Sequence, residues 1–139
     1  MNKINFHFQS VIFKIANKRK LKKHIENIFN TEKKSLKYLN FIFCSDKYLL
    51  KINKKYLQHD YYTDVITFDL SQNKKEITGE IYISVDRIKE NASVYNKTFR
   101  EELSTVIIHG ALHLCGYNDK TSKDIKRIRR AENFYLANL

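Results

Sequence analysis

The sequence predicts an α+β fold in which helices pack on one mixed, four-stranded sheet. Two apolar patterns recur along the 139 residues. Short runs in which apolar residues alternate indicate strands, and longer runs in which they recur every three or four positions indicate helices. The resulting order, β-α-β-α-β-β-α-α-α, is typical of an α+β protein. The chain has no repeat and no linker rich in proline or glycine, and its length suits a single domain.

The first 44 residues predict two strands separated by a helix. Ile4–Phe8 alternates between apolar and polar residues and predicts the first strand. A strongly basic segment from about Asn17 to Asn30 predicts a helix, and we expect His24 on its surface. The next apolar run predicts a second strand from about Leu36 to Cys44.

A short helix and a hairpin follow. The helix begins at Ser45 and Asp46, because a side-chain oxygen at this position accepts hydrogen bonds from free helix N–H groups. It is expected to end near Leu57 and to carry three residues inward: Leu49, Ile52 and Tyr56. After a loop at residues 59–63, two runs predict a hairpin of Asp64–Leu70 and Gly79–Val85.

The last third of the chain predicts three helices. Asp86 is expected to cap a helix that runs to about Tyr95. The next helix, which begins at residue 98 or 99 and ends at Cys115, is apolar on nearly every face and should be buried. A capping region at residues 121–124 precedes a basic helix that ends near Ala137.

The buried helix begins a pattern of residues whose spacing suits metal binding. His109, His113 and Asp119 lie at positions i, i+4 and i+10. The helical repeat places both imidazoles on one face, and Gly116 permits the left-handed backbone that ends a helix and reverses the chain. Three protein ligands leave a fourth position for water, as in catalytic zinc sites. The pattern therefore predicts one Zn²⁺ per chain and a metal-dependent hydrolase.

Two histidines satisfied by ordinary hydrogen bonds on a helix face are the alternative to a metal site. Two observations favour the metal. Gly110 and Gly116 account for two of the three glycines in the chain, and both lie in this run. Imidazoles in apolar surroundings also need strong partners, and a shared cation would satisfy both.

The charge of the chain indicates a polyanionic partner. Its 26 basic and 15 acidic residues give a net charge of +11, with clusters at residues 18–23, 54–55 and 126–130. Such a surface favours nucleic acid, which binds basic proteins through phosphate contacts and counterion release. The alternative is a composition rich in Lys, Asn, Ile and Tyr that reflects only an AT-rich genome.

Cysteine use and hydropathy predict a cytoplasmic protein outside the membrane. Cys44 and Cys115 do not form a disulfide framework, and Cys115 is expected to pack in the core rather than to bind metal. The first twenty residues lack the features of a signal peptide, and no apolar run approaches membrane-spanning length.

The residue after the first histidine indicates which class of metal-dependent hydrolase is disfavoured. Metallopeptidases with the motif H-E-x-x-H use that glutamate as general base, whereas this chain has Gly110. Peptide hydrolysis by that mechanism is therefore disfavoured. Metal-bound water also attacks phosphorus, and the basic surface favours a polynucleotide substrate.

The histidine run and three earlier segments carry a resemblance to a known family. Residues 109–117 read HGALHLCGY, which is similar to the signature H-G-x-L-H-L-x-G-Y. Ile52-Asn53-x-x-Tyr56, TDVITF at 63–68 and GEIYIS at 79–84 match further family segments in order. Over about residues 36–120 the chain thus resembles the YbeY family of bacterial rRNA maturation endoribonucleases.

The resemblance implies a zincin-like fold and a single metal-dependent endoribonuclease domain over residues 1–139. It implies zinc-dependent cleavage of single-stranded RNA, in which metal-bound water attacks the phosphodiester. It also implies 16S rRNA 3′-end maturation and ribosome quality control, with rRNA and the small ribosomal subunit as partners. The alternative is a ribosome assembly factor that binds rRNA with a structural metal and little or no catalysis.

Two positions depart from the family pattern. Asp119 stands where the family usually has a third histidine, and its oxygen shifts the metal preference toward Mn²⁺ or Mg²⁺; Asp124 is a weaker substitute. Leu57 stands where family members commonly have an arginine suited to clamp the scissile phosphate. Three other residues are candidates for that charge: Lys54, Lys55 and Arg100.

The end of the loop and the first residue of the hairpin supply the remaining candidates for substrate binding: Tyr62, Thr63 and Asp64. Tyr62 and its neighbour Tyr61 have rings that would stack on unpaired bases. Ordinary core or surface packing is the alternative for both. His59 is expected to be a plain loop histidine, and the alternative is a contact to a metal ligand or to a phosphate. Asp64 is expected to fix local geometry by hydrogen bonding.

Overall fold

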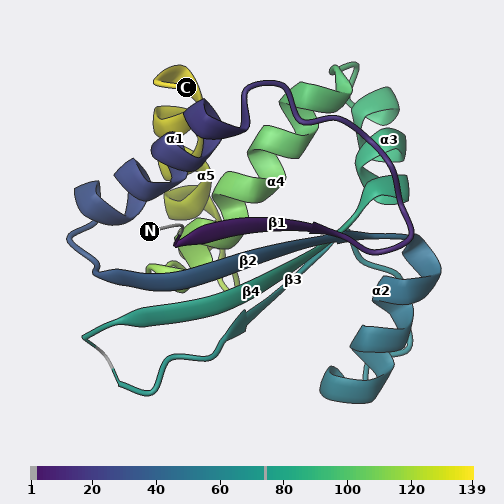
Figure 1. The fold of residues 1–139 in the computed structure, drawn as a ribbon, viewed down its shortest axis with the longest axis horizontal. Coiled ribbons are helices and arrows are strands. Elements are labelled where there is room, and N and C mark those ends of the chain that lie inside the picture. Colours follow the sequence, from purple (N-terminus) through teal and green to yellow (C-terminus); the bar gives the residue numbers. More distant parts are fainter. Residues whose placement is uncertain (1–2, 74) are drawn as a thin grey trace.

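One mixed sheet with helices on its faces forms the body of the molecule (Figure 1). The computed structural model describes residues 3–73 and 75–139. Its elements are β1 Ile4–Phe8, α1 Lys18–Thr31, β2 Leu36–Cys44, α2 Asp46–Ile52, the π-helix η1 Asn53–Leu57, β3 Val65–Asp69, β4 Ile77–Ser84, α3 Val85–Val94, α4 Phe99–Leu114 and α5 Ser122–Ala137. The strand order is β1-β2-β4-β3, with β3 alone antiparallel to its neighbour. The predicted α+β class is confirmed.

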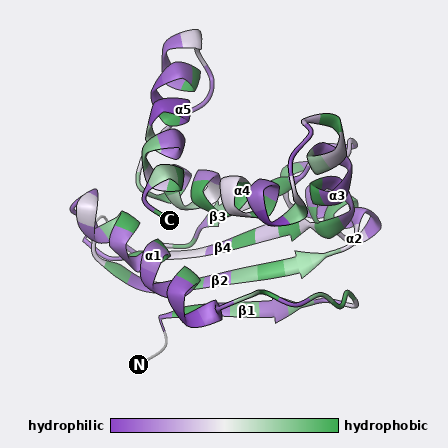
Figure 2. Ribbon diagram, turned by 90° about the horizontal axis from the view of Figure 1, so that it is seen from above, coloured by the Kyte–Doolittle hydropathy of each residue, from purple (hydrophilic) through white to green (hydrophobic). Residues whose placement is uncertain are grey.

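Helix α4 is the centre of the fold because it contacts other elements on two sides. Toward the sheet, Val106, Ile107 and Ala111 join the main core. On the other side, Ile108 and Leu112 pack with residues of α1 and α5. The prediction that this helix is buried is therefore confirmed. In Figure 2, α1 and α5 are mainly hydrophilic in colour, whereas α4 carries a larger share of hydrophobic residues.

Two glycines let α4 lie close to β4. A Cβ atom on Gly110 would lie 2.9 Å from Cδ1 of Ile81, and one on Gly79 would lie 2.7 Å from Cδ1 of Leu114. Real Cβ atoms do not approach neighbours this closely without displacement. The absence of side chains at these positions sets the depth at which the histidine-bearing helix sits on the sheet.

The helix after the hairpin begins earlier than predicted. Ser84, not Asp86, is its N-cap, since the Ser84 hydroxyl accepts the backbone N–H of Arg87. Asp86 lies in the first turn and accepts the backbone N–H of Asp46 instead. The prediction for Asp86 was wrong because β4 leads into α3 without a linker. The hairpin of β3 and β4 is confirmed.

Two predictions of side-chain orientation were also wrong. Tyr56 is 56% exposed, because the chain continues α2 as a π-helix whose wider turn changes the direction of the side chains. His24 is half-buried on α1, and its Nε2 atom has no hydrogen-bond partner within the described part of the chain. Burial lowers the pKa of His24. None of the described helices is long and apolar enough to cross a membrane.

Candidate metal centre

The end of α4 is built by the turn that the sequence predicted at Gly116. Gly116 has a φ of 105°, and its N–H donates to the carbonyl of His113. The N–H of Tyr117 donates to the carbonyl of Leu112. These two bonds form a Schellman motif, which requires a left-handed residue just beyond the helix. The turn reverses the chain and returns Asp119 to the two histidines.

Each histidine ring is held by a second partner through its Nδ1 atom. His113 Nδ1 lies 2.9 Å from the carbonyl oxygen of Tyr117, in the turn that ends the helix. His109 Nδ1 lies 2.6 Å from Oε2 of Glu132 on α5. A carbonyl and a carboxylate only accept hydrogen bonds, so both Nδ1 atoms carry a proton. In the neutral rings the free lone pair is therefore on Nε2.

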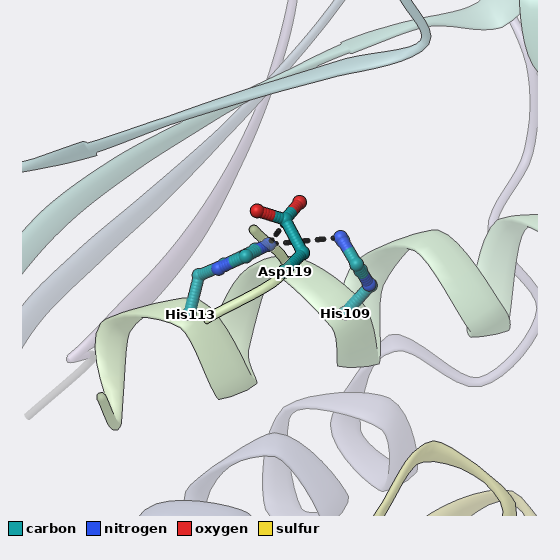
Figure 3. A group of neighbouring side chains, drawn as sticks. All are labelled: His109, His113 and Asp119. Atoms are coloured by element: carbon teal, nitrogen blue, oxygen red, sulfur yellow. Dashed lines mark hydrogen bonds and ion pairs between the residues drawn. The ribbon is translucent and has the colours of Figure 1, made fainter. Parts of the chain in front are cut away.

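The two Nε2 atoms face one another at 2.9 Å (Figure 3). Asp119 Oδ2 lies 3.4 Å from Nε2 of His113, and one ligand atom from each of the three residues lies within 4.8 Å of the others. Two lone pairs this close need a shared proton or cation between them. Two imidazole nitrogens and a carboxylate oxygen are a zinc donor set, so these residues fit a divalent metal.

Acidic neighbours add negative potential to this centre. Burial opposes a charged His109, but the Glu132 hydrogen bond, together with the charges of Glu132, Asp119 and Asp64, raises the pKa of His109 above its ordinary value. Burial raises the pKa of Asp64, although His109 and Arg87 oppose this shift. A cation placed between the histidines would interact favourably with all three carboxylates.

Two cavities meet at His109. The larger, of about 780 Å³, runs from the loop before β3 along that edge strand to α4, and His109, His113 and Asp119 line it. We call it the histidine cavity. The smaller, of about 370 Å³, lies between α4 and α5 and is lined by His109, Asp119 and Glu132. Asp64 lines both cavities. The centre is thus open to a ligand along the exposed edge of the sheet.

Comparison with known proteins identifies relatives across nearly the full chain. Residues 5–139 match the family described as Endoribonuclease YbeY. The chain is 46% identical to Endoribonuclease YbeY of Amoebophilus asiaticus over 138 residues, which cover 98% of this chain and 94% of that protein. It is 43% identical to Endoribonuclease YbeY of Cytophaga hutchinsonii over 134 residues, which cover 96% and 94%. The chain belongs to the YbeY family.

The fold agrees with this membership. The solution structure of TM1509 from Thermotoga maritima matches with a TM-score of 0.64 and 29% sequence identity. The match covers 96% of this chain and 86% of that one. The resemblance noted over residues 36–120 therefore extends over both ends of the chain, including the basic helix α5.

The residues expected to bind substrate in this YbeY chain are divided between different parts of the surface. Thr63 and Asp64 line the histidine cavity, as does Leu57. Tyr62 is 48% exposed, lies outside that lining, and has the guanidinium of Arg87 5.1 Å from its ring centroid. Of Tyr62, Thr63 and Asp64, the structure thus places the last two in the histidine cavity.

The three basic residues considered in place of a family arginine lie elsewhere. Lys54 forms an ion pair with Asp60 at 3.2 Å, and Lys55 Nζ lies 5.2 Å from the ring centroid of Tyr56. Neither lysine lines the histidine cavity. Arg100 lines a separate cavity of about 480 Å³ near the starts of α1 and α4. None of them provides a cation beside the histidines.

Glu132 is the residue that sequence reasoning missed. It lies on α5, 23 positions after His109, and no spacing motif connects the two. One signal was present: Ile128 and Tyr135 are buried at four positions before and three after Glu132. A carboxylate on the apolar face of a helix requires a buried partner. Cys115 is buried in the core, as predicted.

Proposed function

We propose that this protein is a zinc-dependent endoribonuclease that cleaves single-stranded RNA. Its proposed role is 16S rRNA 3′-end maturation and ribosome quality control, with rRNA and the small ribosomal subunit as partners. Family membership supports RNA cleavage, since the named relatives are endoribonucleases. The cytoplasmic location expected for this role stays a prediction.

The observation that best supports metal dependence is the distance of 2.9 Å between the Nε2 atoms of His109 and His113. Both rings already use Nδ1 as donor, so Nε2 is free to ligate on each. We propose His109, His113 and Asp119 as the ligands of one Zn²⁺ per chain. A bound zinc ion would supply Lewis acidity toward a phosphate oxygen and toward the water that attacks it.

The chain's own residues prepare the centre for this chemistry. Glu132 and the Tyr117 carbonyl fix the tautomer and orientation of the rings. The buried body of α4 keeps both rings on one rigid element, whereas Asp119 has a side chain that is 53% exposed. Two of the proposed ligands are thus held rigidly, and the third is accessible to solvent. A polymeric substrate can therefore approach the site from the side of Asp119. Thr63 and Asp64 are proposed to contact that substrate from the loop.

The surface charge supports a nucleic-acid substrate. Basic side chains on the first half of α1 and along α5 are mostly exposed, and α5 also borders the metal centre through Glu132. Phosphate contacts from such helices would position RNA across the centre without reading its sequence. Lys54, Lys55, Tyr62 and Arg100 are proposed to contact RNA outside the histidine cavity.

A ribosome assembly factor with a structural metal is the second candidate. The observation that favours it is Leu57, which lines the histidine cavity without adding charge. Such a protein would bind rRNA and cleave it little or not at all. A metallopeptidase is disfavoured, because Gly110 lies against Ile81 of the sheet and no carboxylate follows His109.

The deciding experiment measures metal content and RNA cleavage on the same samples. Wild type, His113→Ala and Asp119→Ala are purified and assayed on a single-stranded RNA and on the same sequence in a duplex. We expect about one zinc per chain in the wild type, and loss of both zinc and single-strand cleavage in the two variants. His7→Ala is the matched control, since His7 is exposed on β1 and bonds to Asn40.

The outcomes separate the candidates. Zinc in the wild type without cleavage above the His113→Ala background supports the assembly factor. Absence of any divalent metal from the wild type means that the histidines only share a proton. Small ribosomal subunits that carry 3′-extended 16S rRNA then test the biological substrate, because the proposed enzyme must shorten them.

A further inference from the structure

Within the described part of the chain, a single lysine or arginine lines the histidine cavity. Among its lining residues, Asp64, Asp69 and Asp119 are acidic, and Lys120 is the one side chain with a permanent positive charge. A polyanionic substrate that enters this cavity needs a cation to offset the carboxylates. Lys120 directly follows Asp119 along the chain and lines the same cavity as the three candidate ligands.

Lys120 is also free to bind a ligand. It is exposed, and within residues 3–73 and 75–139 it makes no ion pair or hydrogen bond through its side chain. Two other lysines are engaged in ion pairs, Lys54 with Asp60 and Lys97 with Glu102. A lysine that keeps all three ammonium donors unused provides a point charge for a phosphate.

A pair of stacked rings lies on the wall of the same cavity. The rings of His59 and Tyr61 have centroids 5.0 Å apart and an interplanar angle of 20°. The Tyr61 hydroxyl lies 2.9 Å from Nδ1 of His59. Tyr61 is 55% exposed, so part of its ring is available to a ligand. Both residues line the histidine cavity.

The loop that carries these rings is fixed at both ends by one buried residue. Asn53 is 2% exposed, and its Nδ2 donates to the carbonyl of Tyr61 at 2.9 Å. Its own carbonyl accepts the backbone N–H of His59 at 3.2 Å. The ring pair is therefore held in place before a ligand arrives, which lowers the entropic cost of stacking.

We infer that Lys120 and the His59–Tyr61 pair form a binding subsite for one unpaired nucleotide. Lys120 contacts a phosphate beside the metal centre, and the exposed face of the ring pair stacks on a neighbouring base. Every base offers an aromatic face, so the subsite selects single strands without selecting sequence. A paired base in a duplex has no free face. The inference rests on the proposed function, since it assumes an RNA substrate.

The test measures RNA binding in the presence of a chelator, so that cleavage does not interfere. Fluorescence anisotropy gives the Kd of a six-nucleotide single-stranded RNA for wild type, Lys120→Met, Tyr61→Ala and Tyr61→Phe. Lys89→Met is the matched control, because Lys89 is exposed on α3 outside the cavity and outside the basic helices proposed to contact RNA. Each Kd is measured at several salt concentrations.

We expect Lys120→Met to reduce the slope of log K against log salt by about 0.7, the value for one phosphate contact on a single strand. Tyr61→Ala should weaken binding by about 5- to 100-fold, whereas Tyr61→Phe keeps the stack and stays within about threefold of wild type. A set of oligonucleotides with one abasic position probes the base contact directly. Abasic RNA should bind wild type more weakly, whereas Tyr61→Ala should not distinguish it from normal RNA.

Two results overturn the subsite: a Lys120→Met slope equal to that of Lys89→Met, or equal sensitivity to the abasic position in wild type and Tyr61→Ala. If the metal-loaded wild type still cleaves single-stranded RNA in that case, the proposed function stands and the subsite alone fails. If the wild type neither binds nor cleaves RNA, both fail.

Discussion

His109 and Glu132 form a hydrogen bond of 2.6 Å that joins α4 to α5. The bond fixes Nδ1 of the ring as donor and directs Nε2 at His113. Helix α5 therefore contributes to the candidate metal centre, although none of its residues belongs to the three-ligand cluster. This arrangement explains why a carboxylate is present on the apolar face of a basic helix.

Glu132→Gln should weaken zinc binding while the fold is retained. Partners of this kind typically change metal affinity by about 10- to 100-fold when they are removed, because they hold the ring and raise its basicity. Competition with a chelator of known affinity measures the change. Glu90→Gln is the control, since Glu90 is an exposed glutamate on α3 that pairs with Arg87. Equal zinc affinity in both variants would refute the role of Glu132.

Zinc affinity should rise with pH through the region above 6.5. The pKa of His109 is raised above its ordinary value of 6.5 in the metal-free protein, despite burial, by Glu132 and the nearby carboxylates. The charged His109–Glu132 pair thus stabilises the metal-free fold fully below pH 6.5, and this contribution is lost as the pH rises through the folded pKa. Zinc requires the neutral ring, so the proton competes with it.

Calorimetric titration of the metal-free protein with zinc between pH 5.5 and 8.5 checks this dependence. The Glu132→Gln variant should reach its full affinity at a lower pH, because it lacks the hydrogen bond and the charge of Glu132 that raise the pKa of His109. A zinc affinity that does not change between pH 6 and 8 in the wild type would contradict the prediction.

Gly110→Ala should destabilise the protein although alanine favours helices. Its Cβ would lie 2.9 Å from Cδ1 and 3.0 Å from Cγ2 of Ile81. Overpacking of this kind costs about 1–3 kcal/mol, which exceeds the gain of about 1 kcal/mol from replacing a helical glycine. Urea unfolding of Gly110→Ala, Ile81→Val and the double variant measures the coupling. We expect the double variant to lose less than the sum of the single losses, and additive losses would exclude this contact as the cause.

Both cysteines should be unreactive in the folded protein. Burial raises the pKa of Cys44 and of Cys115 to about 12, and both side chains lie in the core. The thiolate is the reactive form, so a disulfide reagent at pH 8 should modify neither thiol before unfolding and both after it. Rapid modification of Cys115 in the native state would show that the end of α4 opens.

The sequence determined those features that depend on neighbours along the chain. The helical repeat placed His109 and His113 on one face, and Gly116 adopts the left-handed turn that brings Asp119 back to them. The β3–β4 hairpin followed from two alternating runs separated by a polar turn. Each of these depends on local backbone preferences and side-chain periodicity, and both can be read from the sequence alone.

Tertiary structure decided which distant residues meet these local features. Packing of α5 against α1 and α4 brings Glu132 to His109. The fold places Lys120 in the histidine cavity and Arg100 in another. The reason is that contacts between elements depend on how their faces pack, and the spacing of residues along the chain does not encode that packing.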